Sequence, residues 1–306
     1  MPAAEPPILA VVGATAAGKS DLALDLAECL GGEVVNTDSM QVYCGMDVGT
    51  AKLPVTDRRG IPHHLVDILD VTESASVAEF QRLARAAIDD CVGRGVPPVL
   101  VGGSALYTRA ILDEFDFPGT DERVRARLYS ELAESGSEAL HRRLASLDTA
   151  AAAGIGPANG RRIVRALEVI ELTGRPFTAT LPGYAYHYPH AEQIGVDIDR
   201  PTLDERIERR VESMWQAGLV AEVRNLVDRG LRHGRTAAKA LGYRQVLAFL
   251  DGEIDEDEAK RRTVTGTRRF ARRQDAWFRK DPRVRWVPAG TSARDVYPRA
   301  YSRATR

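Results

Sequence analysis

An eight-residue loop near the N-terminus constrains the fold more than any other feature of this sequence. It matches the pattern G-x-x-x-x-G-K-[ST] and lies between an apolar run, 7–12, and an amphipathic stretch, 21–30. A strand, a loop and a helix in this order turn backbone N–H groups and the helix N-terminus toward a phosphate, Lys19 adds positive charge, and the Ser20 hydroxyl can reach Mg²⁺. A phosphorylated or diphosphorylated ligand is therefore predicted at this P-loop. Its residues are Gly13, Ala14, Thr15, Ala16, Ala17, Gly18, Lys19 and Ser20.

Apolar runs alternate with helical patterns through the first part of the chain. Strands are expected at 7–12, 34–35 and 98–101, with helices at 21–30 and 77–92 between them. Strands that alternate with helices indicate an α/β fold. We predict a P-loop NTPase-like parallel sheet flanked by helices.

The pattern changes near residue 118, after which only helices are expected as far as residue 189. A strand pattern returns at 191–198, so the middle of the chain is predicted to be an all-helical insertion domain. About 19 residues at the C-terminus are expected to be loosely ordered. The predicted helices after residue 118 are 121–134, 137–147, 161–172, 203–217, 220–229 and 259–280. The predicted parts are 1–117, the first part of the P-loop core; 118–189, the helical insertion domain; and 190–306, the rest of the core with basic C-terminal helices.

Charge is distributed unevenly along the chain. The 306 residues carry 42 Lys and Arg against 43 Asp and Glu, a net charge of −1, which by itself argues against a nucleic-acid partner. However, the first 120 residues carry 8 basic and 17 acidic residues, whereas segment 259–306 carries 15 basic and 3 acidic residues. Such an asymmetry is typical of a protein with a polyanionic partner.

Cysteine content and hydropathy bear on the cellular compartment. Cys29, Cys44 and Cys91 lie far apart without a C-x-x-C pair, which predicts neither a disulfide framework nor a zinc knuckle. The longest apolar stretch, 8–18, is too short to span a bilayer, and no basic residue precedes Lys19 as in a signal peptide. We expect a cytoplasmic protein with no membrane partner.

Histidines form two close pairs in the sequence. His63 is adjacent to His64, and His187 lies near His190, but neither pair has Cys or carboxylate partners at the spacing of metal ligands. We favour turn or packing roles for all four.

A carboxylate after the second strand is the candidate base. Many nucleotide hydrolases hold Mg²⁺ with an Asp at the end of an apolar strand, but the strand at 98–101 ends in Gly102, Gly103 and Ser104. Asp38 follows the strand at 34–35, and strand carboxyl ends line the crevice where such folds bind ligands. Asp38 is therefore the leading candidate for a general base, and an ordinary turn aspartate is the alternative.

Arginines cluster at the start of one predicted helix. Arg161, Arg162 and Arg165 follow the expected cap Asn159, where cations oppose the helix dipole unless an anion lies nearby. We favour phosphate binding. The alternative is local pairing, such as that of Arg165 with Glu168.

Basic residues recur in the last part of the chain. Arg206 and Arg210 share one helix face, and segment 239–245 combines two cations and an aromatic residue around a glycine, which suits backbone contact and base stacking. The helix at 259–280 has a basic face for phosphates and an apolar stripe for packing, although a merely solvated helix is the alternative. The basic face comprises Arg261, Arg262, Arg268, Arg269, Arg272, Arg273, Arg279 and Lys280, and the stripe comprises Val264, Phe270, Ala271, Trp277 and Phe278.

Longer motifs give a resemblance to a known family. The motifs are GATAAGKS (13–20), NTDSMQVYCGMDVGTAK (36–52), PHHLVDI (62–68), VLVGGSALY (99–107), RRIVRALEVIELTGRP (161–176), RIERRV (206–211), GLVAEV (218–223) and KALGYRQ (239–245). With these motifs, the sequence resembles the tRNA dimethylallyltransferases, also called tRNA isopentenyltransferases, from residue 7 to 287, and it lacks the zinc finger of eukaryotic members, which indicates a bacterial type. Departures are small, and only Cys44, where a basic residue is common, bears on a tRNA contact.

The resemblance implies transfer of a dimethylallyl group from dimethylallyl diphosphate to N6 of adenosine 37, beside the anticodon, in tRNAs that read codons beginning with U. It implies that the P-loop holds the diphosphate of the donor rather than ATP, with Mg²⁺ as cofactor. On this resemblance Asp38 takes the N6 proton, Lys19 and Arg210 hold the diphosphate, and Ser20 helps to hold Mg²⁺. The resemblance also implies that the insertion domain, 118–189, contacts tRNA. The implied contacts with the anticodon loop are Asp38, Ser39, Met40, Gln41, Ser104, Arg125, Arg161, Arg162, Arg165, Lys239, Gly242, Tyr243 and Arg244.

Three other functions stay open. The protein could be an ATP-dependent kinase of a small metabolite, a dimethylallyltransferase that acts on a free adenine nucleotide, or a non-catalytic P-loop RNA-binding protein. The basic segment 259–306 and the helical insertion favour a macromolecular acceptor over the first two, and Asp38 argues against the third. We expect a monomer.

Overall fold

One part of the chain is inserted into another. The computed structural model describes residues 5–114, 117–177 and 183–298, and it divides the chain into two units. Unit 1 comprises residues 1–113 and 186–306, whereas unit 2 comprises 114–185. The chain leaves unit 1 after Asp113 and re-enters it at Tyr186, and these two residues form an antiparallel bridge.

Unit 1 is built on a parallel sheet with β1 near its centre. Its six described strands have the order β3-β2-β4-β1-β5-β6, and every adjacent pair is parallel. The predicted α/β class is therefore confirmed. The strands are β1 (Ile8–Val12), β2 (Glu33–Asn36), β3 (His63–His64), β4 (Pro98–Val101), β5 (Ala191–Asp197) and β6 (Val284–Pro288).

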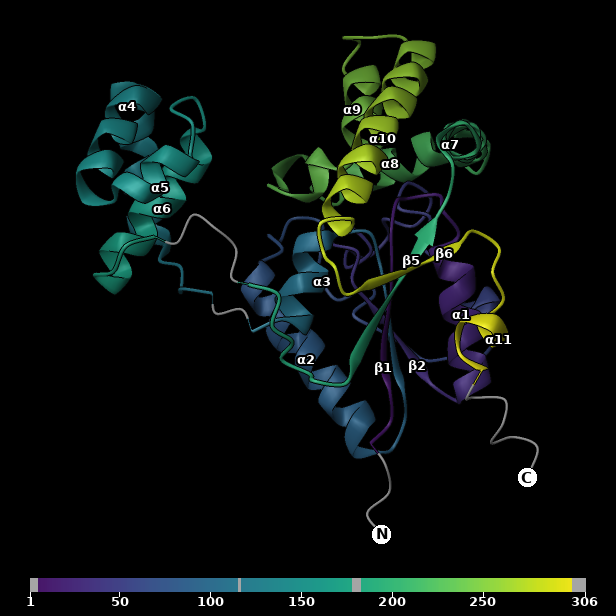
Figure 1. Cartoon of the computed structure of the whole chain (residues 1–306). Coiled ribbons are helices and arrows are strands. Elements are labelled where there is room, and N and C mark those ends of the chain that lie inside the picture. The colour runs from purple at the N-terminus through teal and green to yellow at the C-terminus, as the bar shows by residue number, and fades with distance from the viewer. Residues whose placement is uncertain (1–4, 115–116, 178–182, 299–306) are drawn as a thin grey trace. The chain divides into compact units, whose positions relative to one another are not determined.

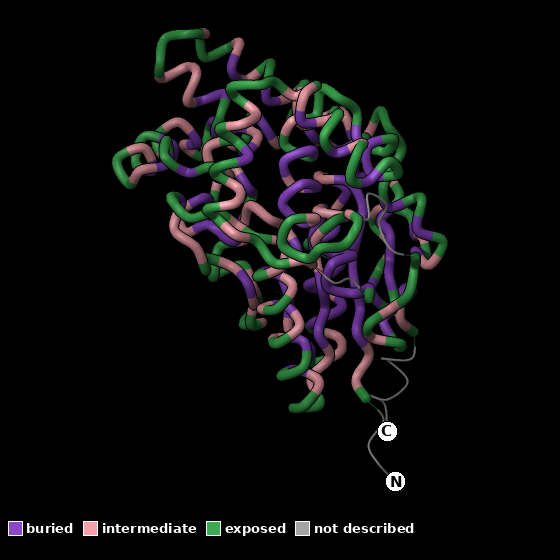
Figure 2. Tube along the Cα trace, turned by 90° about the vertical axis from the view of Figure 1, so that its left-hand side faces the viewer, coloured by how far each residue is buried: buried purple, intermediate pink, exposed green. Residues whose placement is uncertain are grey.

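Helices cover both faces of the sheet. Helix α1 (Lys19–Leu30) and the short α11 (Ala293–Val296) lie on one face, and α2 (Val77–Gly93) and α3 (Ala105–Leu112) lie on the other (Figure 1). All five residues of β1 are buried, because alternate side chains enter the two layers between sheet and helices. In Figure 2 the trace is accordingly coloured as buried (purple) along the strands. The ordered α11 contradicts the expectation of a loose C-terminus at 293–296, while residues 299–306 lie outside the described residues.

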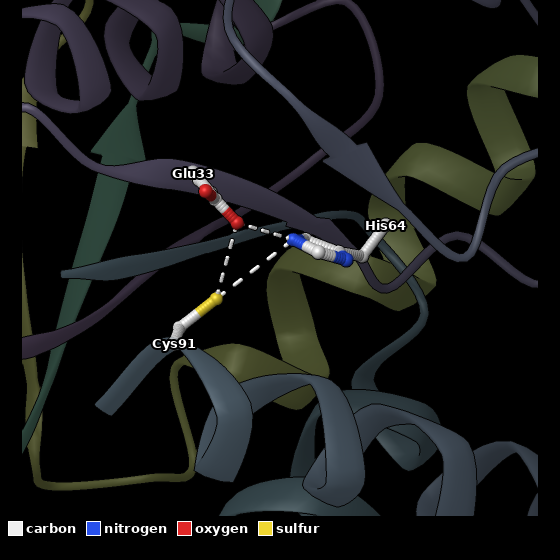
Figure 3. Close-up of side chains that lie close together, drawn as sticks. All are labelled: Glu33, His64 and Cys91. Atoms are coloured by element: carbon white, nitrogen blue, oxygen red, sulfur yellow. Dashed lines mark hydrogen bonds and ion pairs between the residues drawn. The ribbon is translucent and has the colours of Figure 1, made fainter. Parts of the chain in front are cut away.

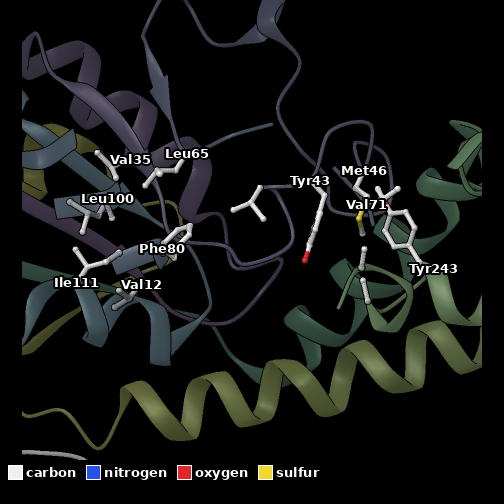
Figure 4. Packing of buried hydrophobic residues seen from close by; sticks show 14 of the residues in the cluster. Val12, Val35, Tyr43, Met46, Leu65, Val71, Phe80, Leu100, Ile111 and Tyr243 are labelled. Carbon is white, nitrogen blue, oxygen red and sulfur yellow. The ribbon is translucent and has the colours of Figure 1, made fainter. Parts of the chain in front are cut away.

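Four further helices lie beyond the carboxyl ends of the strands in unit 1 (Figure 1). Their apolar faces extend the core of the sheet, so that Tyr43, Met46 and Tyr243 continue the cluster that begins at Val12 and Phe80 (Figure 4). This arrangement places helices directly over the edge where a P-loop fold binds its ligand. The helices are α7 (Arg200–Gln216), α8 (Leu219–Asp228), α9 (Tyr243–Leu250) and α10 (Glu256–Phe278), with 3₁₀ turns η1 (Val55–Asp57), η2 (Leu231–His233) and η3 (Ala237–Lys239).

The described residues of unit 2 form helices joined by loops and turns, with no strand among them. The helices are α4 (Glu122–Leu147), α5 (Thr149–Gly154) and α6 (Gly160–Thr173). Gly136, with φ of +78°, interrupts α4 at the point where the sequence predicts a boundary between two helices. The three helices enclose a small core of their own, which includes Leu128, Leu144 and Ile163.

Candidate active site

The P-loop joins β1 to α1 in a backbone conformation that needs its glycines. Gly13 and Gly18 have φ of +132° and +102°, a region that residues with side chains rarely adopt. A Cβ atom at Gly13 would also lie 3.1 Å from the backbone oxygen of Val196. The predicted order of strand, loop and helix is confirmed, and the loop lies at the N-terminus of α1, where an anion is stabilised.

Lys19 spans the P-loop with its ammonium group. Nζ donates a hydrogen bond to the backbone oxygen of Ala14 at 2.7 Å, and the side chain is buried. Burial and the positive charge of Arg210 lower the pKa of Lys19 to about 8, although the charge of Asp38 acts in the opposite direction. A diphosphate bound to this loop would supply the negative charge that stabilises the buried cation.

Helix α7 brings two arginines to the P-loop. Nη1 of Arg210 donates to Oγ1 of Thr15 at 3.1 Å, and Nη2 donates to the backbone oxygen of Thr50 at 3.3 Å. One turn earlier, Nη1 of Arg206 donates to the backbone oxygen of Ala17 at 3.3 Å. The shared helix face predicted for these arginines is confirmed, and that face is turned toward the P-loop.

Asp38 lies just beyond the carboxyl end of β2, in a turn closed by its neighbours. Oδ1 of Asn36 accepts a hydrogen bond from the N–H of Asp38, and Oδ1 of Asp38 accepts one from the N–H of Met40, both at 2.8 Å. Within the described residues, Oδ2 of Asp38 has no hydrogen-bond partner. Burial lowers the pKa of Arg210, and the negative charge of Asp38 opposes this effect, as it does at Lys19. The carboxylate therefore belongs to the P-loop site, with one oxygen available to a ligand.

The segment after β4 closes against the Asp38 turn. A Cβ atom at Gly102 would overlap the side chain of Thr37, so a glycine is required for this close approach. Oγ of Ser104 accepts a hydrogen bond from the N–H of Ser39 at 3.3 Å, and the two hydroxyl oxygens also lie 3.3 Å apart. The fold thus brings both serines next to Asp38, while their contact with tRNA stays a prediction.

Ser20 and Gln41 line a small cavity beside the P-loop, with a volume of about 60 Å³. Nε2 of Gln41 donates to the backbone oxygen of Thr50 at 3.2 Å, the same oxygen that Arg210 contacts. Ser20 is exposed in the first turn of α1. A serine hydroxyl, diphosphate oxygens and water are the hard oxygen ligands that Mg²⁺ prefers, so the residues present fit the expected ion.

Two residues that the sequence analysis did not single out also support this site. Gln274 of α10 hydrogen-bonds both to the P-loop and to the segment after β4. Glu222 of α8 accepts hydrogen bonds from the N–H groups of Asp47, Val48 and Gly49, at 3.1, 2.7 and 3.2 Å. Glu222 lies within the motif GLVAEV, which indicated the family of the chain but not the hydrogen-bond partners of Glu222. No local pattern in the sequence marks Gln274 as a residue of the site.

Tyr243 does not stack on a base. Its side chain is 0% exposed, its hydroxyl donates to Oε1 of Glu222 at 2.6 Å, and its ring lies so close to Gly49 that a Cβ atom there would collide with it. The prediction of base stacking at Tyr243 is therefore wrong. Instead, Tyr243 and Glu222 anchor the segment that carries Thr50, the acceptor of Arg210.

We expect Tyr243→Phe to destabilise unit 1 by about 1.5 to 3 kcal/mol, because the half-buried carboxylate of Glu222 loses a charge-assisted hydrogen bond from a buried hydroxyl. Chemical denaturation measures the difference. Tyr129→Phe is the matched control, since Tyr129 is exposed on α4. Equal denaturation midpoints for the two variants would show that the Glu222 hydrogen bond contributes nothing.

In unit 2, two of the predicted tRNA-binding arginines pair with one buried carboxylate. Glu168 is 0% exposed, and its Oε2 accepts hydrogen bonds from Arg125 and Arg165, each at 2.8 Å. The alternative of local pairing is therefore confirmed for Arg165. Arg161 and Arg162 are exposed at the start of α6, which Asn159 caps as predicted, and their contact with phosphates stays a prediction.

A basic groove of about 590 Å³ separates α9 from α10. Arg261 and Arg262 line it but pair with Glu258, whereas Arg244 and Arg269 are exposed and have no acidic partner within the described residues. Lys239, at the end of η3, is exposed, and Gly242 is the N-cap residue before α9, with φ of +89°.

The two faces predicted for α10 are only partly correct. Ala271 and Phe278 are buried as the apolar stripe predicts, but Trp277 is 38% exposed. On the basic face, Arg268 pairs with Glu208 of α7, and Arg279 pairs with Asp197. The other six residues of the basic face are exposed, so phosphate binding and the solvated alternative both stay open for this face.

The fold gives His64 the partners that the sequence did not show. Nε2 of His64 lies 2.7 Å from Oε2 of Glu33, and the Cys91 thiol lies 3.4 Å from the same oxygen (Figure 3). The premise that no Cys or carboxylate accompanies the histidines is therefore wrong for His64. However, Arg94 donates to both oxygens of Glu33 at 2.8 Å, and burial, followed by the Glu33 hydrogen bond, raises the pKa of Cys91 to about 11, which disfavours a metal-binding thiolate. This network is complete without an ion and stabilises the junction of β2, β3 and α2.

No helix among the described residues combines the length and apolar character that crossing a bilayer requires.

The family model described as IPP transferase matches residues 41–281. The tRNA dimethylallyltransferase of a Nocardioides species is 65% identical over 281 residues, or 92% of this chain and 91% of that protein. The enzyme of the same name from Streptomyces griseus is 61% identical over 297 residues, or 97% and 95% of the two chains.

Solved structures agree with the sequence comparison. The full-length tRNA isopentenylpyrophosphate transferase from Bacillus halodurans is 39% identical, covers 98% of this chain and 96% of that chain, and gives a TM-score of 0.70. A eukaryotic dimethylallyltransferase acting on tRNA shares the fold, with a TM-score of 0.79, 24% identity, and coverage of 98% of this chain and 77% of that chain. The resemblance found in the sequence is confirmed, and the chain belongs to the IPP transferase family.

Proposed function

We propose that this protein transfers a dimethylallyl group from dimethylallyl diphosphate to N6 of adenosine 37 in tRNAs that read codons beginning with U. The observation that carries the proposal is the position of the Asp38 carboxylate, whose charge acts on both cations of the P-loop site, Lys19 and Arg210. A base for the acceptor and a cradle for the leaving group therefore occupy one site. Membership of the IPP transferase family and the names of the relatives support this activity.

The proposed reaction forms a bond between N6 of adenine and C1 of the dimethylallyl group while the bond between C1 and the diphosphate oxygen breaks. The diphosphate leaves with the bonding electrons, and Lys19, Arg210 and the P-loop N–H groups stabilise its charge. Asp38 accepts the proton that N6 loses, through the oxygen that has no partner in the described residues. No water needs activation, which fits the absence of a carboxylate after β4, where Gly102, Gly103 and Ser104 stand.

We propose that the Ser20 hydroxyl would hold Mg²⁺ at the bound diphosphate, where the ion would supply further positive charge for the leaving group. The exposed Ser20 hydroxyl lies one residue from Lys19, so both side chains serve the same diphosphate. We also propose that the protein acts as a monomer in the cytoplasm, where its acceptor tRNA is present. The three cysteines, which are unpaired in the structure, are consistent with a reducing compartment.

The decisive experiment incubates the protein with unmodified tRNA and either dimethylallyl diphosphate or ATP, and then analyses the nucleosides by mass spectrometry. We expect one dimethylallyl group on adenosine, in the tRNA and with dimethylallyl diphosphate only. A third incubation replaces tRNA with AMP. A product on AMP but not on tRNA would support the free-nucleotide alternative, and phosphate transfer from ATP to a small acceptor would support the kinase.

The groove between α9 and α10 predicts how tRNA binding responds to salt. If Arg244 and Arg269 contact phosphates, the affinity for tRNA should fall steeply as the salt concentration rises. Each Arg→Ala change should then reduce the steepness of log K against log [salt], where K is the association constant for tRNA, by about 1. Filter binding at several salt concentrations measures the slope. Arg82→Ala is the control, because Arg82 is exposed on α2 and pairs with Glu79. Unchanged slopes in both groove variants would remove this groove from the tRNA interface.

A further inference from the structure

Gln274 joins the two halves of the active site with one side chain. Its Oε1 accepts a hydrogen bond from the N–H of Thr15 in the P-loop at 2.8 Å, and its Nε2 donates to the backbone oxygen of Gly103 at 2.8 Å. The partners fix the orientation of the amide, because one end faces a donor and the other faces an acceptor. The side chain is 5% exposed, so neither bond is exchanged easily for water.

Each end of this bridge leads to a group of the proposed reaction. Thr15 is also held by Arg210, so Gln274 and Arg210 fix the same residue of the diphosphate cradle from two directions. On the other side, Gly103 precedes Ser104, whose hydroxyl accepts the N–H of Ser39, the residue after Asp38. The loop for the leaving group and the turn with the base are therefore connected through one amide.

Small residues next to Gln274 leave space for its side chain. A Cβ atom at residue 103 would overlap Nε2 of Gln274, so the glycine provides space for the amide. Ala271, one turn earlier on α10, is buried in a cluster with Ala14 of the P-loop and with Leu203 and Ile207 of α7. Small side chains on both sides thus let α10 approach the P-loop closely enough for the hydrogen bond.

We propose that Gln274 is a positioning residue that sets the diphosphate cradle at the correct distance from Asp38. This inference rests on the proposed function. Gln274 need not touch either substrate. Its contribution is to hold two loops in one arrangement, and errors of a fraction of an ångström between reacting groups are costly in rate.

Two substitutions test the bridge. Gln274→Met keeps the approximate size and removes both hydrogen bonds, whereas Gln274→Glu keeps an acceptor for Thr15 and loses the donor for Gly103 when it is ionised. When it is protonated, the carboxylic acid again offers one donor and one acceptor. Gln216→Met is the matched control, because Gln216 is exposed on α7.

For Gln274→Met we expect kcat to fall about tenfold at saturating substrates, with an unchanged Kd for tRNA and a several-fold weaker affinity for inorganic diphosphate. For Gln274→Glu we expect the ratio of its kcat to that of the wild type to rise as the pH falls from about 8 to about 6, as the acid restores the bridge. Gln216→Met should behave as the wild type does.

Wild-type kcat and diphosphate affinity in Gln274→Met would overturn the proposal. If that variant does not fold, a pH-independent ratio for Gln274→Glu overturns it instead, since a purely structural defect has no reason to recover with acid. If the wild-type protein transfers no dimethylallyl group, the proposed function fails. The affinity for inorganic diphosphate then still decides whether Gln274 shapes the P-loop.

Discussion

Replacing Asp38 by Asn lowers the turnover of dimethylallyl transfer by about 10²-fold or more, if Asp38 is the base, because the amide cannot accept the N6 proton. The substitution retains the oxygen that accepts the N–H of Met40, so the turn after β2 persists. Steady-state transfer of a radiolabelled dimethylallyl group to tRNA measures the effect. The Kd for tRNA should stay close to that of the wild type.

Asp38→Ala separates chemistry from structure, because it removes both the base and the hydrogen bond to Met40. A catalytic role predicts that Asn and Ala variants are similarly slow. A role confined to the turn predicts that only the Ala variant is impaired, in which case Asp38 leaves the mechanism and the alternative of a turn aspartate stands.

The affinity for dimethylallyl diphosphate should fall as the pH rises through about 8. Burial, followed by the charge of Arg210, lowers the pKa of Lys19 to about 8, so the free protein holds a charged Lys19 below this pH and loses the charge above it. Since the diphosphate is fully ionised in this range, its binding then weakens by about tenfold for each pH unit. Calorimetric titration from pH 7 to 9.5 measures the change.

Two variants at Lys19 provide the controls for this pH dependence. Lys19→Arg keeps a positive charge at every pH, so its affinity should not change across the range. Lys19→Met lacks the charge, and we expect weak binding at every pH together with a loss of about 10²- to 10³-fold in kcat/KM. A wild-type affinity that is constant between pH 7 and 9.5, or a decline that Lys19→Arg shares, would contradict the role given to the ammonium group.

The fold could be predicted where its determinants are local. The P-loop, β1 and α1 follow from one motif and its flanking periodicity, and the break at Gly136 follows from a glycine between two helical patterns. In contrast, β3 has two residues and β6 reads Val-Arg-Trp-Val-Pro, and neither shows enough alternation to predict a strand. They form because a neighbouring strand supplies backbone partners, namely β2 for β3 and β5 for β6.

The residues of the candidate site also divide into those that a local sequence pattern predicts and those that it does not. Lys19, Ser20 and Asp38 were found from short motifs and strand ends, and the structure places them together with Arg210. Gln274 lies 259 residues from its partner Thr15, so no local pattern could connect them. The wrong prediction of base stacking at Tyr243 has a related cause. Cations on both sides of Tyr243 suggested an exposed ring, whereas its hydroxyl bonds to Glu222 and its ring packs against Gly49.

The insertion of unit 2 also dictates an order of events during synthesis. Strand β1 is made first, yet one of its two neighbours, β5, begins at Ala191, after all of unit 2 has been translated. Helices α4 to α6 are contiguous and share a core, so they can assemble on the ribosome while the sheet still lacks its last two strands. Until β5 is made, the edge of β1 that pairs with it exposes unpaired backbone groups beside apolar side chains. Nascent chains that end before β5 are therefore the ones that would need a chaperone most.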